Sequence, residues 1–427
     1  MRILILCPWY APLIHPRAHR WTAIAEYWAA QGHAVCVVCG KKRGEPADAF
    51  RNGVRVCRVG FDSLKELLYF WGGEKKARGR VGVRPEARAG AWAKWAAWLY
   101  RTLWRSWAYP DDSALWIGPA RRKALQLLAD QSFDLLITVS LPFAPHLAGL
   151  CIRQRYPSLN WIADMGDPFA IRPGLHNRYP SLSRRDEARV LRQADCVAVT
   201  TPTLARALAD AYGPEAIRAV RVIPPLLHPA PEDWEVVGEQ GIGESGLRER
   251  ADVLQLGYFG TFYRPVRTPD ALLPYLDAAR EAGQACLLHI YGDVFPEFLP
   301  ALRHRPDVVL HGLQPRATCR QAMRQMDLLL SVGNTSAYQL PGKLVEYMAA
   351  ERPVAHLALH AQDPCPAFYG DDLHVFDGCA PNEAELARWI ALLAALRSGG
   401  VQSVAKDLRP YGIAAVAGTY LDSMVNR

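Results

Sequence analysis

Short apolar runs alternate with amphipathic segments along the first half of the chain. The apolar runs have the length and the β-branched content of buried strands, and a segment with helical periodicity at 21–31 separates the first two. The apolar runs lie at residues 2–7, 34–39, 133–140, 160–167, 194–202 and 220–225. A further helix is expected after His146. This alternation predicts strand–helix–strand units, and therefore a parallel sheet.

The second half repeats the pattern after residues 226–252, which are rich in Pro, Gly and Glu and are predicted to be a linker or an exposed excursion. Strands are predicted at 254–262, 285–293, 307–312, 327–333, 352–359 and 372–378. Helices are predicted from Pro269, around 318–326, from near Lys343, from near Asn382 and at about 406–427. The sequence therefore predicts an α/β protein with Rossmann-like domains at 1–225 and 253–405, their parallel sheets facing a central cleft. The last helix is expected to pack back on the first domain.

The composition is that of a globular protein, with 427 residues of which 50% are apolar and 22% charged. The ten cysteines show no framework, and Cys36 and Cys39 fall in a predicted buried strand, so a reduced cytoplasmic compartment is expected. The N-terminal apolar run is too short for a signal peptide. The longest uncharged run, 135–152, contains two prolines and reads better as strand, loop and helix than as a membrane span.

The excess positive charge is concentrated in residues 72–108, where nine Lys and Arg face two Glu. Within it, Trp92, Trp95 and Trp107 fall on one helical face and Lys94, Arg101 and Arg105 on the other. Basic residues opposite tryptophans are typical of a helix at an anionic membrane surface. An amphipathic helix packed on its own domain explains the pattern equally well. No nucleic-acid motif accompanies the charges, so no nucleic-acid partner is expected.

The segment QLPGKLVEYMAAERPV at 339–354 combines a loop, a helix start and two charges. Gly342 allows close approach of a ligand, and a helix beginning near Lys343 presents unpaired N–H groups to an anion. Glu346 lies one turn further on the same face, where it would accept hydrogen bonds from hydroxyls beside that anion. The alternative is a solvated Lys–Glu pair.

A second basic loop follows a glycine turn in GYFGTFYRPVR at 257–267. Gly260 and Thr261 follow the predicted strand, and Arg264 and Arg267 precede the next helix. Arginine binds phosphate oxygens through two hydrogen bonds. Surface arginines are the alternative, but two such loops in one half favour a phosphate site.

The ordered set GYFGTFYRPVR, HIYGD, VVLHGLQPR, MDLLLSVG and QLPGKLVEYMAAERPV resembles the donor half of glycosyltransferase family 4. The first half also fits, through GHAVCVV, SLPFAPHLAGL, WIADMGDPFA and ADCVAVTTP. The resemblance covers nearly the whole chain except about 50–109 and the linker. It implies a GT-B fold, a nucleoside-diphosphate sugar bound by the second domain, retention of configuration, and catalysis without a metal or other cofactor.

The resemblance also implies roles for individual residues. Arg267 or Arg264 and Lys343 would bind the diphosphate, and Glu346 would hold the ribose. The base would lie near Tyr291 and Gly292 and near residues 311–313, which include Gly312 and Leu313. The family often has a second glutamate eight residues before Glu346, where this chain has Tyr338. The donor sugar would then be held by the Tyr338 hydroxyl or by backbone amides of 337–340, which include Gln339 and Leu340.

Candidates for the acceptor side lie in the first half. His15, Arg17, His19 and Arg20 are expected in a loop after the first strand, where they would bind an anionic acceptor or the donor phosphate; a loop solvated by its charges is the alternative. Asp164 and Asp167 follow a strand and would act as a general base or orient an acceptor hydroxyl, although loop-capping is the commoner role. His146 would cover the reacting sugar.

These observations predict a hexosyltransferase that builds a lipid-linked or surface-polysaccharide glycan. It would be cytoplasmic, with peripheral binding to the inner face of the cell membrane through residues 72–108. Two alternatives remain: a nucleotide-sugar epimerase of the same fold, and a non-catalytic protein that binds sugar nucleotides.

Overall fold

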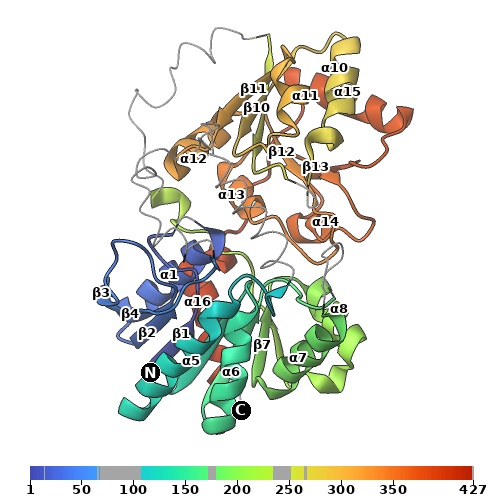
Figure 1. Cartoon of the computed structure of the whole chain (residues 1–427). Coiled ribbons are helices and arrows are strands. Elements are labelled where there is room, and N and C mark those ends of the chain that lie inside the picture. The colour runs from blue at the N-terminus through green and yellow to red at the C-terminus, as the bar shows by residue number, and fades with distance from the viewer. Residues whose placement is uncertain are drawn as a thin grey trace, which may run out of the picture. The chain divides into compact units, whose positions relative to one another are not determined.

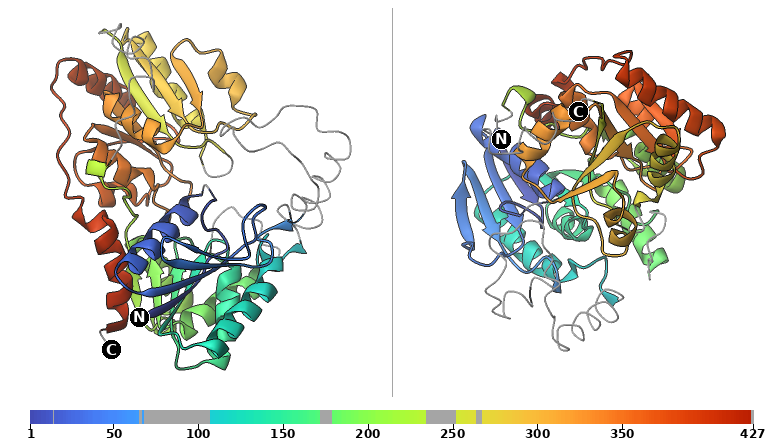
Figure 2. Two further views of the ribbon diagram at one scale, coloured as in Figure 1. Left: turned by 90° about the vertical axis from the view of Figure 1, so that its left-hand side faces the viewer. Right: turned by 90° about the horizontal axis from the view of Figure 1, so that it is seen from above.

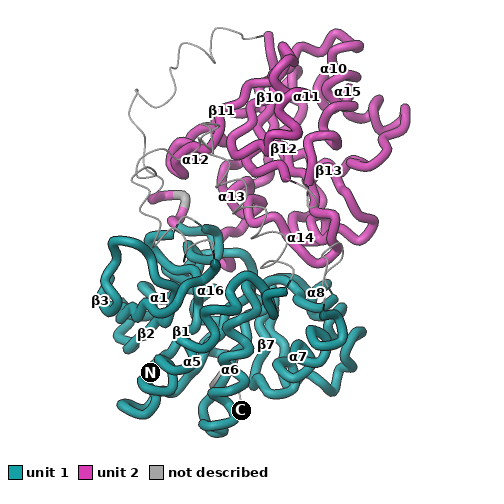
Figure 3. Tube along the Cα trace, viewed as in Figure 1, with its two compact units in different colours: residues 1–78, 85–228, 412–427 teal, residues 79–84, 229–411 magenta. Residues whose placement is uncertain are grey.

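The computed structural model describes residues 1–13, 15–64, 67, 107–171, 179–233, 252–263 and 267–425. These residues form two compact units, 1–228 with 412–425 and 229–411 (Figures 1 and 3). Each unit contains a sheet with helices on both faces. Arg264 and nearly all of the basic, tryptophan-rich segment lie outside the described residues.

The first unit is built on an eight-stranded sheet in the order β3-β4-β2-β1-β5-β6-β7-β8, parallel except for the β3–β4 pair. Its strands are β1 (Arg2–Leu6), β2 (Ala34–Cys39), β3 (Asp48–Arg51), β4 (Val54–Arg58), β5 (Leu135–Ser140), β6 (Asn160–Met165), β7 (Cys196–Val199) and β8 (Val220–Val222). Its helices are α1 (Pro16–Ala30), α5 (Ala114–Asp130), α6 (Ala144–Arg155), α7 (Pro180–Gln193), α8 (Pro202–Tyr212) and α16 (Ile413–Val425). The six predicted strands are confirmed, whereas β3 and β4 were not predicted because they are short and carry charges.

One face of this sheet packs against α1 and α16, which lie side by side (Figure 2). Ile3 and Ile5 of β1 share a buried core with Trp21 and Trp28 of α1 and with Tyr420 of α16. The Trp28 indole donates a hydrogen bond to the Ala417 carbonyl at 3.3 Å. The C-terminal helix, which begins at Ile413 rather than at 406, therefore belongs to the core of the first unit.

The start of α1 corrects one sequence prediction. Arg17, His19 and Arg20 were expected in a loop, but the helix begins at Pro16 and all three lie on it. Proline suits the first helical position because its fixed φ is already helical and its missing N–H is not needed there. His15 caps the helix by accepting a hydrogen bond from the Arg17 N–H.

The second unit has a fully parallel six-stranded sheet in the order β11-β10-β9-β12-β13-β14. Its strands are β9 (Leu254–Phe259), β10 (Cys286–Tyr291), β11 (Val308–Gly312), β12 (Leu328–Val332), β13 (Val354–Ala358) and β14 (Leu373–Asp377). Its helices are α10 (Leu273–Glu281), α11 (Leu299–Arg303), α12 (Arg316–Gln325), α13 (Lys343–Ala350), α14 (Cys365–Tyr369) and α15 (Glu383–Arg397). All six predicted strands are confirmed, and α13 begins at Lys343 as predicted.

The two faces of this sheet bury separate cores. Tyr258 and Leu276 pack with Trp389 of α15 on one face, while Met323 and Leu344 pack on the other under α12 and α13. Since every strand is parallel, the loops that follow β9, β10, β11 and β12 emerge at one edge of the sheet, where α/β proteins bind ligands.

Candidate active site

Arg267 is a largely buried cation at the carboxyl edge of the second sheet. Its Nη2 donates a hydrogen bond to Asn334 Oδ1 at 2.6 Å. Its Nε is inaccessible to solvent and has no hydrogen-bond partner among the described residues. No carboxylate of the described residues forms an ion pair with this guanidinium. A buried guanidinium without a counter-charge is costly, because the cation has lost water without gaining an anion. The site is therefore suited to an anionic ligand.

Asn334, which the sequence analysis did not single out, holds Arg267 in place. It follows β12, and its Nδ2 donates to the Gln339 carbonyl at 3.1 Å while its Oδ1 accepts from Arg267. One buried side chain thus joins the arginine loop to the loop that precedes α13. The signal available in the sequence was an asparagine just after a strand end, a position where polar residues commonly shape a ligand loop.

Lys343 and Glu346 occupy the first turn of α13 and contact each other. Lys343 Nζ lies 3.0 Å from Glu346 Oε2, and Arg316 Nη2, at the start of α12, lies 3.7 Å from Glu346 Oε1. Burial raises the pKa of Glu346, but Lys343 and Arg316 outweigh that effect and the pKa is lowered overall. Glu346 is therefore an ionised acceptor at neutral pH, while Lys343, with 31% of its side chain exposed, can turn to a ligand.

Tyr347 anchors α13 to the sheet behind this pair. Its fully buried hydroxyl donates to the Leu330 carbonyl at 3.1 Å and accepts from the Phe259 N–H at 3.1 Å. The first turn of α13 is therefore held against the ends of β9 and β12. The sequence analysis did not single out Tyr347, and its polar role depends on contacts with distant strands that only the fold brings together.

Three aromatic rings stack across neighbouring strands near the same edge. The ring centroids of Phe259 and Tyr291 are 4.7 Å apart, with an angle of 6° between the ring planes. The centroids of Tyr291 and His311 are 4.0 Å apart, with an interplanar angle of 3°. Arg316, which contacts Glu346, follows His311 by five residues, a reach of at most about 18 Å. The ring stack lies at the carboxyl ends of β9, β10 and β11, the edge of the sheet against which the first turn of α13 is held.

The glycine turns after β9 and β10 touch each other. The Gly260 N–H donates to the Tyr291 carbonyl at 3.0 Å, and the Gly292 N–H donates to the Gly312 carbonyl at 2.8 Å. Gly292 has a φ of +149°, and a Cβ there would lie 2.0 Å from the Gly260 oxygen. The turns at Gly260, Gly292 and Gly312 are thus brought together as one surface, with Thr261 partly buried and Leu313 exposed beside it.

The loop 337–342 connects these groups to α13. Tyr338, Gln339 and Leu340 are partly buried and Gly342 is exposed. The Tyr338 N–H donates to Ser336 Oγ at 3.3 Å, which shapes the turn. The role of Tyr338 toward a donor sugar remains a prediction.

In the first unit, Arg17 joins the two predicted aspartates. Its guanidinium lies 3.3 Å from Asp167 and 3.8 Å from Asp164. Asp164 is buried and accepts hydrogen bonds from the Trp21 indole at 3.1 Å and the Tyr420 hydroxyl at 2.9 Å. Its carboxylate thus ties α1 and α16 to the sheet, whereas Asp167, with 20% of its side chain exposed, remains accessible.

The histidines of the first unit occupy different environments. His146 is fully buried on α6, with Nδ1 2.7 Å from Thr138 Oγ1 and no partner for Nε2 among the described residues. Burial lowers its pKa to about 3, and burial together with Arg17 lowers that of His15 to about 4, so both rings are neutral at pH 7. His19 is exposed on α1, and Arg20 is buried, donating to the Pro224 carbonyl at 2.8 Å.

A buried cluster of His356, Asp363 and Cys365 has the residue types of a metal site. His356 Nε2 lies 3.0 Å from Asp363 Oδ2, and its Nδ1 lies 3.0 Å from Ser331 Oγ. Asp363 Oδ1 accepts from the Cys365 N–H at 2.8 Å. These hydrogen bonds, including the one to Ser331, account for the contacts of the three side chains, so the contacts give no reason to place an ion there.

Comparison with known proteins places the first unit in a family. Residues 18–225 match the model of the glycosyl transferase 4-like domain. Residues 18–225 are a glycosyl transferase 4-like domain. No curated protein sequence matches this chain closely enough to count as a relative.

Solved structures resemble the chain along its length. Sucrose-phosphate synthase of Thermosynechococcus elongatus is 16% identical, with a TM-score of 0.66 over 99% of this chain and 97% of that one. HepE of Anabaena, in complex with UDP and glucose, is 12% identical, with a TM-score of 0.61 and full coverage of both chains. A structure described as trehalose-6-phosphate from Escherichia coli, bound with UDP-2-fluoro glucose, is 12% identical, with a TM-score of 0.61 over 100% of this chain and 99% of that one.

At this level of identity the structural likeness establishes the GT-B fold. The family match itself is confined to residues 18–225, within the first unit. Most of the recognised motifs lie in the second unit. None of the helices in the described part of the chain is both long and apolar enough to cross a membrane.

Proposed function

We propose that this glycosyltransferase moves a hexose from a nucleoside-diphosphate sugar to an acceptor hydroxyl of a lipid-linked or surface glycan. The observation that carries the proposal is the buried Arg267 guanidinium, which has no carboxylate partner among the described residues. A diphosphate supplies the missing anion. HepE, which has the same fold, is described in complex with UDP and glucose.

Each group in the second unit has a part in this proposal. Arg267 and Lys343 neutralise the charge that develops on the leaving diphosphate, which lowers the barrier to sugar transfer without a metal. The ionised Glu346 accepts hydrogen bonds from the ribose hydroxyls. The stacked rings ending at His311 and the glycine turn at Gly292 lie where the base binds.

In the first unit, Asp167 and Arg17 face the acceptor. Asp167 orients the acceptor hydroxyl, and Arg17 holds Asp167 in place at 3.3 Å. The transferred sugar keeps its anomeric configuration. The enzyme works in the cytoplasm on the inner face of the cell membrane, where a lipid-linked acceptor is presented.

Thermal unfolding in the presence of UDP-, GDP-, ADP- and dTDP-sugars identifies the donor, because a ligand stabilises the folded state that binds it. The double variant Arg267→Ala/Lys343→Ala is expected to lose donor turnover and to retain its fold. Arg280→Ala/Arg303→Ala, on exposed helix positions of the same unit, removes the same charge and is the control. Normal turnover by the first double variant would refute the diphosphate assignment, and conversion of the donor sugar without acceptor would indicate an epimerase instead.

A further inference from the structure

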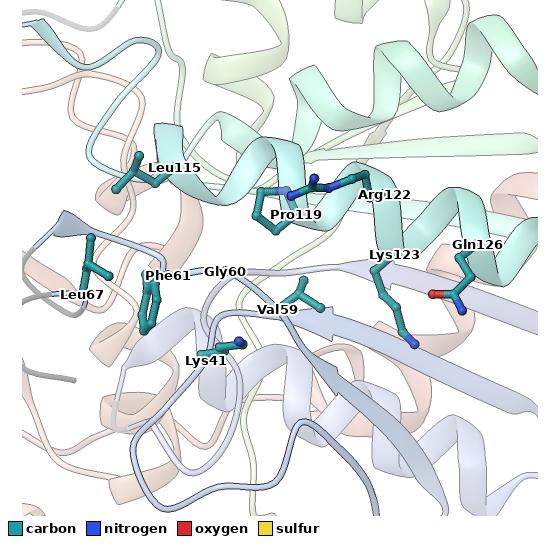
Figure 4. A pocket seen from close by; sticks show the side chains of 10 residues that line it. All are labelled: Lys41, Val59, Gly60, Phe61, Leu67, Leu115, Pro119, Arg122, Lys123 and Gln126. Atoms are coloured by element: carbon teal, nitrogen blue, oxygen red, sulfur yellow. The ribbon is translucent and has the colours of Figure 1, made fainter. Parts of the chain in front are cut away.

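A groove in the first unit lies apart from the residues assigned above. It has a volume of about 590 Å³ and opens at the carboxyl ends of β2 and β4, beneath α5 (Figure 4). Ten residues line it: Lys41, Val59, Gly60, Phe61, Leu67, Leu115, Pro119, Arg122, Lys123 and Gln126. The volume is within the range of small-molecule sites.

Three cations lie on opposite sides of the groove. Arg122 and Lys123 project from α5, and Lys41 projects from the loop after β2 (Figure 4). Neither Lys41 nor Arg122 has a carboxylate within ion-pair distance among the described residues. Lys123 Nζ is 3.9 Å from Asp48, which already pairs with Arg55 at 2.8 Å. The groove therefore holds positive charge that the described part of the chain does not neutralise.

Between the cations the wall is apolar. Phe61 and Val59 come from the segment after β4, and Pro119 and Leu115 come from the facing side of α5. Gly60 has a φ of +57°, and a Cβ there would lie 3.0 Å from two carbons of Pro119. The backbone at Gly60 thus packs directly on α5 and closes one wall of the groove.

The neighbouring acid Asp62 does not balance the cations either, since its Oδ2 lies 2.8 Å from Lys42. Charge complementarity therefore calls for an anion, and the apolar wall calls for a hydrocarbon attached to it.

We propose that this groove binds the phosphate and the first hydrocarbon units of a lipid-linked acceptor. Lys41, Arg122 and Lys123 hold the phosphate, while Phe61, Leu115 and Pro119 contact the chain. The inference rests on the proposed function, which it deepens by naming the acceptor class, a phosphate ester of a long-chain alcohol. The ligand enters at the carboxyl edge of the sheet, as ligands of parallel α/β sheets generally do.

The test is a calorimetric titration of the full chain with decyl phosphate, below its micelle concentration, compared with decanol and with inorganic phosphate. Decyl phosphate is expected to bind at least about tenfold more tightly than either fragment, because charged and apolar contacts both contribute. Lys41→Glu and Arg122→Glu should each weaken its binding by about tenfold or more.

Arg121→Glu is the matched control. Arg121 is exposed on α5 next to Arg122, but it does not line the groove. The Arg121→Glu substitution makes the same change in net charge as Arg122→Glu and should alter binding of decyl phosphate by less than about twofold. Equal losses in the two arginine variants, or equal binding of decanol, would overturn the proposal, and thermal unfolding shows whether each variant is folded.

A separate titration with the nucleoside diphosphate of the donor distinguishes this inference from the proposed function. If that nucleotide binds and decyl phosphate does not, the groove assignment is wrong and the donor assignment stands. If decyl phosphate binds and no nucleotide does, the donor assignment is wrong.

Discussion

Asn334 is expected to affect binding of the nucleoside diphosphate through Arg267, the side chain that it holds in place. Its Oδ1 accepts from the Arg267 guanidinium at 2.6 Å, and its Nδ2 donates to the Gln339 carbonyl at 3.1 Å. Asn334→Ala removes both contacts and leaves a largely buried cation free to turn from the position that a diphosphate would occupy. The variant therefore tests whether the position of this arginine, and not merely its charge, matters for binding.

The magnitudes follow from the number of charged hydrogen bonds lost. Arg267→Ala removes hydrogen bonds to phosphate worth about 1.5–3 kcal/mol, which corresponds to about 10- to 100-fold weaker binding. Asn334→Ala leaves the arginine present but misplaced, so we expect a smaller loss of about five- to tenfold. In the double variant the asparagine has nothing left to position, and binding should match that of Arg267→Ala within about twofold.

The assay is calorimetric titration with the nucleoside diphosphate that gives the largest thermal shift. Arg303→Ala, an exposed change on α11, controls for net charge. Additive losses from the two substitutions would refute the reasoning, because they would mean that Asn334 contributes independently of Arg267. Normal binding by Arg267→Ala would refute the phosphate assignment itself.

Two further predictions concern ionisable groups in the two units. Because the pKa of Glu346 is lowered in the folded protein, its stabilising effect is present above its unfolded pKa of about 4.3 and is lost as the pH falls through the folded value. Urea unfolding should therefore show wild type more stable than Glu346→Gln at pH 6, with the difference shrinking as the pH is lowered below about 4.3; a difference that does not change with pH would contradict this. Tyr420→Phe removes the hydroxyl that donates to Asp164 and accepts from Arg20, and should lower the free energy of unfolding by about 1–3 kcal/mol. An unchanged urea midpoint would mean that this bond does not hold α16 in the fold.

Much of the fold could be predicted from local patterns. Buried parallel strands such as β1, β5 and β12 are continuous apolar runs, and each was recognised because burial on both faces demands such a run. Strands β3 and β4 were missed because they are short and carry charged residues such as Asp48 and Arg55, and of the two only β3 lies at the sheet edge. The start of α1 was placed too late, because the charges of Arg17 and His19 suggested a loop although Pro16 is a favourable first helical residue.

In the candidate site, too, contacts between residues close in sequence could be predicted, whereas contacts between distant residues could not. Lys343 and Glu346 are three residues apart, so their proximity follows from helix geometry and was predicted before the structure. The contacts of Arg267 with Asn334, and of Glu346 with Arg316, join residues that are 67 and 30 positions apart. Partners so distant come together only because parallel strands place their following loops at one edge of the sheet.

By itself, the sequence determined that the chain forms two α/β halves, that α13 starts with a cation and a carboxylate on one face, and that basic loops lie in the second half. Each of these depends on interactions within a few residues. The tertiary structure alone decided that Arg267 is largely buried without a carboxylate partner among the described residues, that Asp164 is engaged by α1 and α16, and that Lys41 and Arg122 share a groove. The reason is physical: desolvation and counter-charge depend on which distant segments pack together, and no local pattern encodes that packing.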